Sequence, residues 1–381
     1  MIQFFVDHEG AHGMRSYLRY RGVSIADTVK IVEYELLPSM KAIPASSAIF
    51  AAVDQIGPTG RAVASAIGHR LQHRGLTVFN DPERVLCRYD LLEALHAAGI
   101  NRFRARRASE SLTGLRYPVF VRQEHRHDGG LSGILPDAQS LRRALTEYVL
   151  RGYRRTDLLV VEFCDPRGAD GLYRKYSALR IGERMLPRHV HVSDFWVSKS
   201  GNSLVNEDTI NEERRYFDER PHDAWLWEVF RIARIEFGRI DYGIVDGVPQ
   251  VWEINTNPTL TRSDRHPRVE MHERFRAMME VTRVAFHTQF LDALRAIDVP
   301  NVGLGELPIT IAPPTRRQMT AEARSLRRAL LRIRVVQGAL DSAPVQRLRG
   351  MLAPIAADVV QAISSFHHRR DDGHSEKPSR P

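Results

Sequence analysis

The sequence predicts a mixed α/β protein made of several packed lobes. The chain of 381 residues is too long to fold around one small hydrophobic core, so two or three lobes are expected. Strand-like and helix-like segments alternate over the first hundred residues, whereas strand-like segments dominate from Tyr117 to Asn255. Beyond them, an arginine-rich segment at 320–340 has the spacing of an amphipathic helix. These observations divide the chain into an α/β lobe, a strand-rich middle part and a helical C-terminal extension.

The first lobe is expected over residues 1–87. Its helix-like segment, 61–75, has apolar residues at helical spacing and ends at Gly75. The strand-like segments around it are 30–37, 46–55 and 76–80. This alternation favours a small α/β lobe with a partly parallel sheet.

The middle part begins with an amphipathic helix at 88–100, which Gly99 is expected to stop. A strand beginning YPV and a flexible glycine loop, HDGGLSG at 127–133, follow it. The segment 157–165, DLLVVEFCD, is almost continuously apolar, which is typical of a buried strand. The expected later units are a core domain over 88–267, a packed helix at 268–298, a linker and arginine-rich extension at 299–366, and a disordered tail at 367–381.

A β-hairpin is expected around the Asp-Gly dipeptide at 246–247, because strands of alternating polarity flank it. For Asp241 to lie opposite Glu253, the loop must contain an odd number of residues, so a three-residue loop at 246–248 is expected. Alternation then places Trp252 on the packed face of the hairpin. The opposite face would carry Arg239, Asp241, Glu253 and Asn255.

Two carboxylates, one amide and one arginine would thus converge on one strand face. Carboxylates so close repel one another unless they are neutralised, and a hard divalent cation with oxygen ligands does this. Magnesium takes only a few protein oxygens and completes its shell with water and substrate phosphates, so the arrangement indicates a metal–nucleotide site. The hairpin alone gives equal weight to another interpretation, in which these are solvent-facing polar residues of a half-exposed sheet.

The order of five segments resembles that of the ATP-grasp superfamily of carboxylate-amine ligases and related kinases, over residues 76–262. The segments are RYDLLEALHAAGI, YPVFVR, HDGG, VVEFCD and GRIDYGIVDGVPQVWEINTNP. The most specific element is Asp241 with Glu253 and Asn255 twelve and fourteen residues later, followed by a proline. The resemblance implies an α+β ATP-grasp core of two subdomains with ATP in the cleft between them, an N-terminal α/β lobe before it and a helical extension after it.

The resemblance also implies cofactors and roles for individual residues. ATP would bind with Mg²⁺ or Mn²⁺, and the implied metal ligands are Asp241, Glu253 and Asn255. Arg239 would be the catalytic residue that steadies the transferred phosphoryl group. The implied cofactor-binding residues are Arg88, Arg122, Gly129, Gly130, Glu162, Phe163 and Cys164. The last three would meet the adenine, and the two glycines would approach the phosphates.

Two positions depart from the family pattern in the phosphate region. The family usually has lysine where this chain has Arg88 and Arg122. Arginine keeps the positive charge and can bind phosphate through two nitrogens, but it is larger and less pliable than lysine. A third departure, Thr259 in place of a glycine common in peptide ligases, bears on the acceptor pocket. An active site of altered geometry and an inactive relative are both consistent with these changes.

The function that the resemblance implies is an ATP- and Mg²⁺-dependent ligase. It would convert a small-molecule carboxylate to an acyl-phosphate that an amine attacks, releasing ADP and phosphate. One alternative is an ATP-grasp kinase that phosphorylates a hydroxyl. Another is an inactive relative that acts as a nucleic-acid-binding or scaffold protein through residues 316–349, which hold nine arginines against Glu322 and Asp341.

Composition favours a soluble cytoplasmic protein. The sequence has no run of eighteen apolar residues and no signal-peptide pattern, so no membrane span is expected. Only Cys87 and Cys164 occur, without the spacing of a disulfide framework or a zinc site. The net charge is +9, and most of the excess lies in the C-terminal segment. A homodimer is a further expectation, since many members of the family dimerise.

Other polar residues are weaker candidates for the cleft. The segment DHEGAH at 7–12 resembles a metal cluster only superficially. Clusters of this kind in loops are usually solvated side chains. The remaining candidates are His125, His127, Asp128, Asp165, Asp170, His189, His191 and Lys199.

Overall fold

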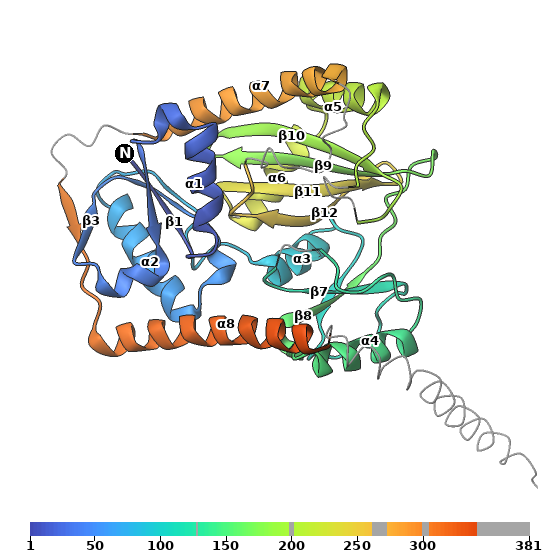
Figure 1. Cartoon of the computed structure of the whole chain (residues 1–381), viewed down its shortest axis with the longest axis horizontal. Helices are drawn as coiled ribbons and strands as arrows, with labels where there is room; N and C mark the ends of the chain where they lie inside the picture. Colours follow the sequence, from blue (N-terminus) through green and yellow to red (C-terminus); the bar gives the residue numbers. More distant parts are fainter. Residues whose placement is uncertain (127–128, 198–201, 261–272, 299–304, 341–381) are drawn as a thin grey trace, which may run out of the picture.

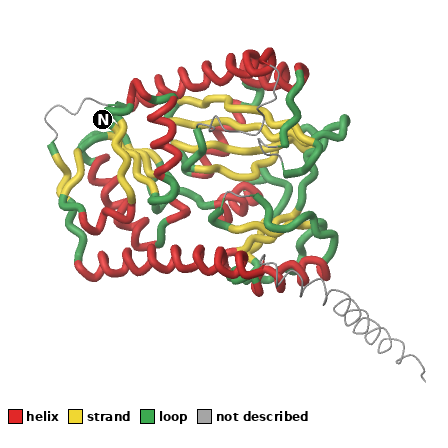
Figure 2. Tube along the Cα trace, viewed as in Figure 1, coloured by secondary structure: helices red, strands yellow, loops and turns green. Residues whose placement is uncertain are grey.

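The computed structural model describes residues 1–126, 129–197, 202–260, 273–298 and 305–340. A parallel sheet forms the N-terminal lobe, a four-stranded antiparallel sheet lies beside it, and a three-stranded sheet lies below the antiparallel one in the view of Figure 1. Helices and sheets pack in layers throughout these parts (Figure 2). The fold class expected from the sequence, an α/β lobe joined to an α+β core of two subdomains, is therefore confirmed.

The parallel sheet of the N-terminal lobe has the strand order β2-β1-β4-β5. Its central strand β1 is buried at all five positions and pairs with both β2 and β4. β1 is not among the predicted strands, because IQFFV shows no alternation of polarity. The elements of this lobe are β1 (Ile2–Val6), α1 (Ala11–Tyr20), β2 (Val29–Glu33), β4 (Ser47–Phe50), α2 (Pro58–Gln72) and β5 (Val78–Phe79).

The strands predicted at 30–37 and 46–55 are shorter than expected, because each runs into a 3₁₀ turn. The first turn, Tyr34–Ser39, contains Pro38, which has no N–H to offer to a sheet. The second turn, Val53–Gln55, follows a residue with a left-handed backbone. Strand propensity alone therefore overstates the length of both strands.

The antiparallel sheet has the strand order β10-β9-β11-β12. Phe286 and Phe290 of α7 pack with Phe237 of β11 in one hydrophobic cluster. Helix α6 packs in another, where Phe230 lies with Tyr242. The elements are β9 (Tyr173–Ile181), β10 (Arg184–Ser193), α5 (Glu207–Glu219), α6 (Asp223–Ala233), β11 (Phe237–Val245), β12 (Val248–Asn255) and α7 (Glu273–Ile297).

The three-stranded sheet, in the order β6-β8-β7, forms the smaller subdomain. Leu141 and Leu145 of α4 pack against Val121 and Val160. Leu92 of α3 belongs to a separate cluster with residues of β6 and β8. The elements are α3 (Arg88–Ala97), β6 (Ala105–Arg107), β7 (Val119–Gln123), α4 (Ala138–Leu150) and β8 (Leu158–Glu162).

The C-terminal helix α8 (Pro313–Leu340) runs from the N-terminal lobe to the smaller subdomain (Figure 1). Met319 packs into the core of the lobe, whereas Ile333 packs against the cluster of α4 and β7. The expected linker contains a short strand, β13 (Glu306–Pro308), which pairs with β3 (Ala42–Pro44). The tail predicted at 367–381 lies outside the described residues. None of the described helices is long and apolar enough to cross a membrane.

The hairpin of β11 and β12 has the expected pairing but a different loop. Asp241 lies opposite Glu253, as predicted, and Val245 lies opposite Val248, so the loop has two residues rather than three. Both loop residues have positive φ, which suits the tight turn that joins twisted strands. The pairing requires one extra residue in β12. This residue is Trp252, which forms a β-bulge instead of lengthening the loop.

The bulge also reverses the expected orientation of Trp252. Val251 takes the core-facing position beside Tyr242, whereas Trp252 lies against Phe103 with ring centroids 5.5 Å apart. The expectation that Trp252 faces the packed side is wrong, because the bulge interrupts simple alternation along β12. Trp252 lines the cleft instead.

Candidate nucleotide-binding cleft

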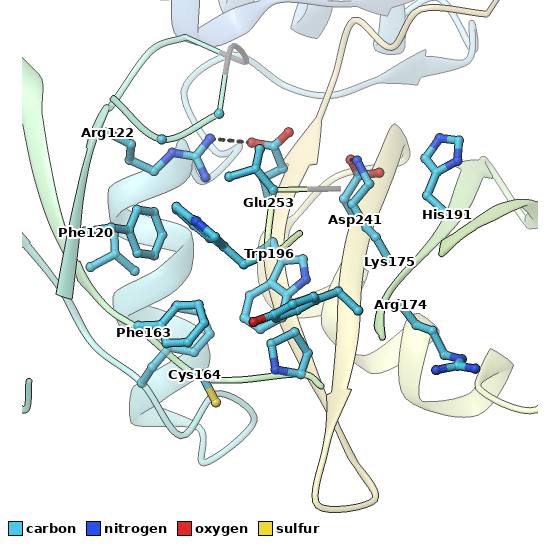
Figure 3. Close-up of a pocket in the computed structure, with 18 of the residues that line it drawn as sticks. Phe120, Arg122, Phe163, Cys164, Arg174, Lys175, His191, Trp196, Asp241 and Glu253 are labelled. Atoms are coloured by element: carbon cyan, nitrogen blue, oxygen red, sulfur yellow. Dashed lines mark hydrogen bonds and ion pairs between the residues drawn. The ribbon is translucent and has the colours of Figure 1, made fainter. Parts of the chain in front are cut away.

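A cavity of about 500 Å³ lies between the antiparallel and the three-stranded sheets, a volume suited to a ligand of nucleotide size. Aromatic side chains line one end of it, and charged side chains line the other (Figure 3). The cavity brings together the predicted site residues Arg122, Gly129, Gly130, Glu162, Phe163, Cys164, Arg239, Asp241, Glu253 and Asn255.

The aromatic end is built around Trp196. Its ring centroid lies 5.1 Å from that of Phe120 and 5.7 Å from that of Phe163, the latter in an edge-to-face arrangement. Trp252 adds a second indole from β12. Flat apolar walls of this kind suit a planar aromatic ligand. Trp196 is not among the residues expected from the sequence, because none of the five segments that resemble the family contains it.

Hydrogen bonds hold the backbone in place at the end of β8, beside the aromatic end of the cavity. Glu162 donates its N–H to the carbonyl of Arg104, and Phe163 donates its N–H to the carbonyl of Pro118. The Glu162 carboxylate accepts hydrogen bonds from Arg116. Burial pushes the pKa of Glu162 up, but these bonds outweigh it and lower the pKa. Its side chain thus anchors the strand.

The two glycines of the predicted phosphate loop line the cavity. Gly129 has φ 94°, which few other residues adopt. A Cβ on Gly130 would lie 3.1 Å from the Trp196 ring and 3.2 Å from the carbonyl of Ser132. A larger residue would therefore crowd the aromatic end. The neighbouring candidates His127 and Asp128 lie outside the described residues.

Glu253 lies at the charged end and receives two arginines from other elements. Its Oε2 accepts from Arg88 Nη2 at 2.7 Å and from Arg122 Nη2 at 2.6 Å. All three side chains are almost fully buried, with exposed fractions of 4, 9 and 13% for Arg88, Arg122 and Glu253. A buried carboxylate between two guanidinium groups forms a strong, geometrically fixed cluster.

Arg88 is more than a partner of Glu253. Its Nη1 donates to the backbone carbonyls of Gln123, Glu124 and Arg126, which lead from β7 into the glycine loop. Arg88 is absent from the residues that line the cavity. The predicted cofactor-binding residue therefore lies behind the cleft, where it joins the loop entrance to β12.

Arg122 does line the cavity, and Figure 3 shows it extending from β7 to Glu253. Its Nε is buried and has no hydrogen-bond partner among the described residues. Burial, reinforced by the neighbouring charge of Arg88, lowers the pKa of Arg122 to about 10. The guanidinium still carries its charge at neutral pH, and a buried donor without a partner is costly unless a ligand satisfies it.

Asp241 receives its partners from its own sheet. Ser177 Oγ donates to Oδ1 at 2.5 Å, and Arg239 Nε donates to the same oxygen at 3.0 Å. Lys175 Nζ lies 3.3 Å from Oδ2. Burial pushes the pKa of Asp241 up, but Arg239, Lys175 and the Ser177 hydrogen bond outweigh it and lower the pKa. Lys175 and Ser177 are further functional candidates, and the sequence motifs do not indicate them.

Asn255 is engaged in a turn at the end of β12. Its Oδ1 accepts from the N–H of Asn257 at 2.8 Å. Asn257 in turn donates to the carbonyl of Gly10, within the DHEGAH segment. The side chain of Asn255 thus helps join the cleft to the N-terminal lobe.

Burial, together with the nearby carboxylates Glu35 and Asp54, raises the pKa of Asp7 in the DHEGAH segment to about 6.

His189 and His191, two weaker candidates, also line the cavity. Their rings lie 4.0 Å apart. Burial, followed by the charges of His191 and Arg188, lowers the pKa of His189 well below its usual range, so its imidazole is neutral. Three other weaker candidates, Asp165, Asp170 and His125, do not line the cavity. Asp165 pairs with Arg167, Asp170 pairs with Arg174, and the carbonyl of His125 accepts from Gln55. Lys199 lies outside the described residues.

The charged end does not fit the expected metal-ligand set in this arrangement. Glu253 Oε2, both Asp241 oxygens and Asn255 Oδ1 already accept hydrogen bonds. The donors are Arg88, Arg122, Arg239, Lys175, Ser177 and the Asn257 backbone. The cleft fits the nucleotide better than the metal, because it offers aromatic walls and an unsatisfied arginine donor.

Comparisons with known proteins found solved structures that are similar to this chain. No protein-family model matches the sequence, and no curated protein matches it significantly. The chain is similar to the D-alanine–D-alanine ligase of Bacillus anthracis, with 16% identity and a TM-score of 0.43, covering 76% of this chain and 98% of the ligase. For the D-alanine–D-alanine ligase of Coxiella burnetii these values are 12%, 0.41, 77% and 98%.

A third similar structure is described as a RimK domain protein ATP-grasp from Sphaerobacter thermophilus. It has 13% identity and a TM-score of 0.38, with 74% of this chain and 99% of that chain covered.

Proposed function

We propose that the cleft binds ATP and that the protein is an ATP-dependent ligase, which activates a carboxylate as an acyl-phosphate for attack by an amine. The observation that carries this proposal is the division of one cavity into an aromatic end and a cationic end. Around the carboxylates of Asp241 and Glu253 lie four cations, so the cluster has an excess of positive charge. The four cations are Arg88, Arg122, Lys175 and Arg239.

The aromatic end would hold the adenine. Phe163 and Trp196 supply flat apolar surfaces, on which a base stacks without the need for specific hydrogen bonds. The carbonyl of Glu162 and the N–H of Cys164 would meet the edge of the base. The hydrogen bonds of Glu162 to Arg116 keep this strand in position while the base enters.

The cationic end would hold the phosphates. Arg122 Nε is a buried donor that a phosphate oxygen would satisfy. Gly129 and Gly130 allow the backbone to approach the phosphates closely. Arg239 and Lys175 lie on the neighbouring strands and would face the transferred group.

ATP would supply the phosphoryl group that turns the carboxylate into an acyl-phosphate. The residues of the chain would contribute placement and charge rather than a nucleophile, since phosphoryl transfer depends mainly on in-line orientation and electrostatic stabilisation. Arg239 and Lys175 are held by Asp241, so their charges are oriented before the substrate arrives.

Two measurements test the proposal. ATP binding is followed by calorimetry, and ADP release is followed with pools of carboxylic acids and amines. Arg122→Ala should weaken ATP binding by about 2 kcal/mol, the cost of losing a charge-assisted contact. The matched control is Arg154→Ala, whose side chain is 59% exposed and pairs with Asp157. Equal ATP affinity in both variants, without ADP release from the native protein, would contradict the proposal. ADP release that needs no amine would indicate a kinase instead.

A second candidate function is nucleotide binding without turnover. The two arginines on Glu253 favour it, because they occupy a carboxylate that the family resemblance assigns to the metal. The same experiment separates the two functions. Binding of ATP with no ADP release from any substrate pool would support the second.

A further inference from the structure

We propose that the cleft takes its nucleotide as a metal-free polyphosphate, with arginine and lysine side chains in place of the divalent cation. The inference rests on the proposed binding of ATP, and it concerns the ionic form that binds. It follows from the contacts of the two strand carboxylates, each of which lies against two cationic side chains.

The first step is the arrangement around each carboxylate. Glu253 Oε2 accepts from two guanidinium groups at 2.6 and 2.7 Å. On Asp241, Oδ1 accepts from Ser177 and Arg239, and Oδ2 lies 3.3 Å from both Arg239 Nη2 and Lys175 Nζ. Four positive side chains thus surround two negative ones, and all of the donors are held in place by the fold.

The second step is what a divalent cation would meet. Magnesium requires oxygen lone pairs at close range and keeps several of its waters. At Glu253 it would compete with the two guanidinium groups and would lie next to both of their charges. Repulsion between like charges at such short range is strongest in a buried site. A cation that bound Glu253 Oε2 would have to displace Arg88 or Arg122, and displacing Arg88 would also release the carbonyls of Gln123 and Arg126.

The third step is what a polyphosphate would meet. Guanidinium groups bind phosphate oxygens through two nitrogens and are less strongly hydrated than ammonium groups. Arg122 lines the cavity while it remains bound to Glu253, and its buried Nε has no hydrogen-bond partner among the described residues. Lys175 and Arg239 lie across the cavity on the antiparallel sheet. The polyanion therefore enters a site whose positive charges are already desolvated and oriented.

This arrangement gives Glu253→Gln the opposite effect from the one that a metal site would show. In a metal site, loss of the carboxylate weakens binding of the magnesium complex of ATP. In an arginine site, the same change removes an anion that competes with phosphate, so metal-free ATP binds more tightly. The sign of the change therefore distinguishes the two kinds of site.

The experiment is calorimetric titration of the full-length protein with ATP, once in EDTA and once in excess MgCl₂. We expect native protein to bind ATP in EDTA at least as tightly as in MgCl₂. Glu253→Gln should raise the affinity in EDTA by about tenfold, the size of one charge-assisted contact. Native binding that is about tenfold tighter in MgCl₂ would overturn the inference and leave the ATP proposal standing. An absence of ATP binding in both buffers would instead remove the ATP proposal itself.

A second variant tests the inference independently, in case Glu253→Gln alters the fold. Asp241→Asn keeps an oxygen for Ser177 and leaves the Arg88 contacts to the backbone intact. It should also raise the affinity for ATP in EDTA, and thermal unfolding of both variants should remain cooperative. Weaker binding in EDTA for both folded variants would overturn the inference.

Discussion

Glu253 and Asp241 lie opposite one another on the same hairpin, yet their partners come from different places. The partners of Glu253 are Arg122 of β7, across the cleft, and Arg88 of α3, behind the cleft, and neither belongs to its own sheet. The partners of Asp241 are Ser177, Lys175 and Arg239, all on its own sheet. One carboxylate therefore joins the two sides of the cleft, whereas the other organises the charges of a single sheet.

The strongest way to test this difference is Arg88→Ala. The change leaves Glu253 with one of its two arginines and removes the contacts that hold the entrance of the glycine loop, so we expect the free energy of unfolding to fall by about 3 kcal/mol. Denaturant unfolding measures it. The control is Arg102→Ala, an arginine that is 46% exposed and pairs with the 82% exposed Asp246; it should cost about 0.5 kcal/mol. Equal losses would mean that Arg88 contributes no more than a surface ion pair.

Asp241→Asn should have the next largest effect, about 2 kcal/mol at neutral pH, because hydrogen bonds to a charged group are lost within one sheet. Burial raises the pKa of Asp241, but Arg239 and Lys175 outweigh it, so the folded pKa lies below the unfolded one. The stabilisation is therefore fully present above the unfolded value of about 3.9 and is lost as the pH falls through the folded pKa. Unfolding curves against pH should show native protein and variant converging in acid. A constant difference would contradict this pKa.

A change at the aromatic end should leave both carboxylate clusters unaffected. Trp196→Ala is expected to weaken ATP binding by about 1.5 kcal/mol, the worth of stacking one base on an aromatic side chain. Its neighbour Phe195 is 53% exposed and does not line the cavity, so Phe195→Ala serves as the control. Calorimetry with ATP measures both, and equal losses would argue against a base at this end.

The smallest expected effect is a coupling energy. Arg88 and Arg122 share Glu253, so the double variant Arg88→Ala with Arg122→Ala should depart from additivity by about 1 kcal/mol in unfolding free energy. Arg88 and Lys175 serve different carboxylates, so their double variant should be additive within about 0.5 kcal/mol. Similar coupling in both pairs would show that the two clusters act as one.

Local pattern predicts much of this cleft. The hairpin, the pairing of Asp241 with Glu253 and the glycine loop all follow from residues that are close in sequence. The three-residue loop is wrong because alternation cannot reveal a bulge, and the tight turn with the bulge at Trp252 gives the same register as a longer loop.

The partners that come from distant strands could not be predicted in this way. Ser177 lies beside Asp241 only because β9 pairs with β11, and nothing in either strand specifies that register by itself. The same is true of Arg88, whose three carbonyl contacts depend on how α3 packs against the end of β7. The family resemblance implies a place for Arg88 in the cofactor site, but its side chain does not line the cavity.

The bulge at Trp252 separates the placement of an aromatic ring on β12 from the pairing of its charged residues. On either side of it, Val251 faces Tyr242 and Glu253 faces Asp241, as they would in a regular hairpin that lacked the extra residue. Trp252 is thus an insertion that gives the cleft an indole without shifting the charge pairs. A variant without this residue would lose the indole from the cleft and would still pair Glu253 with Asp241.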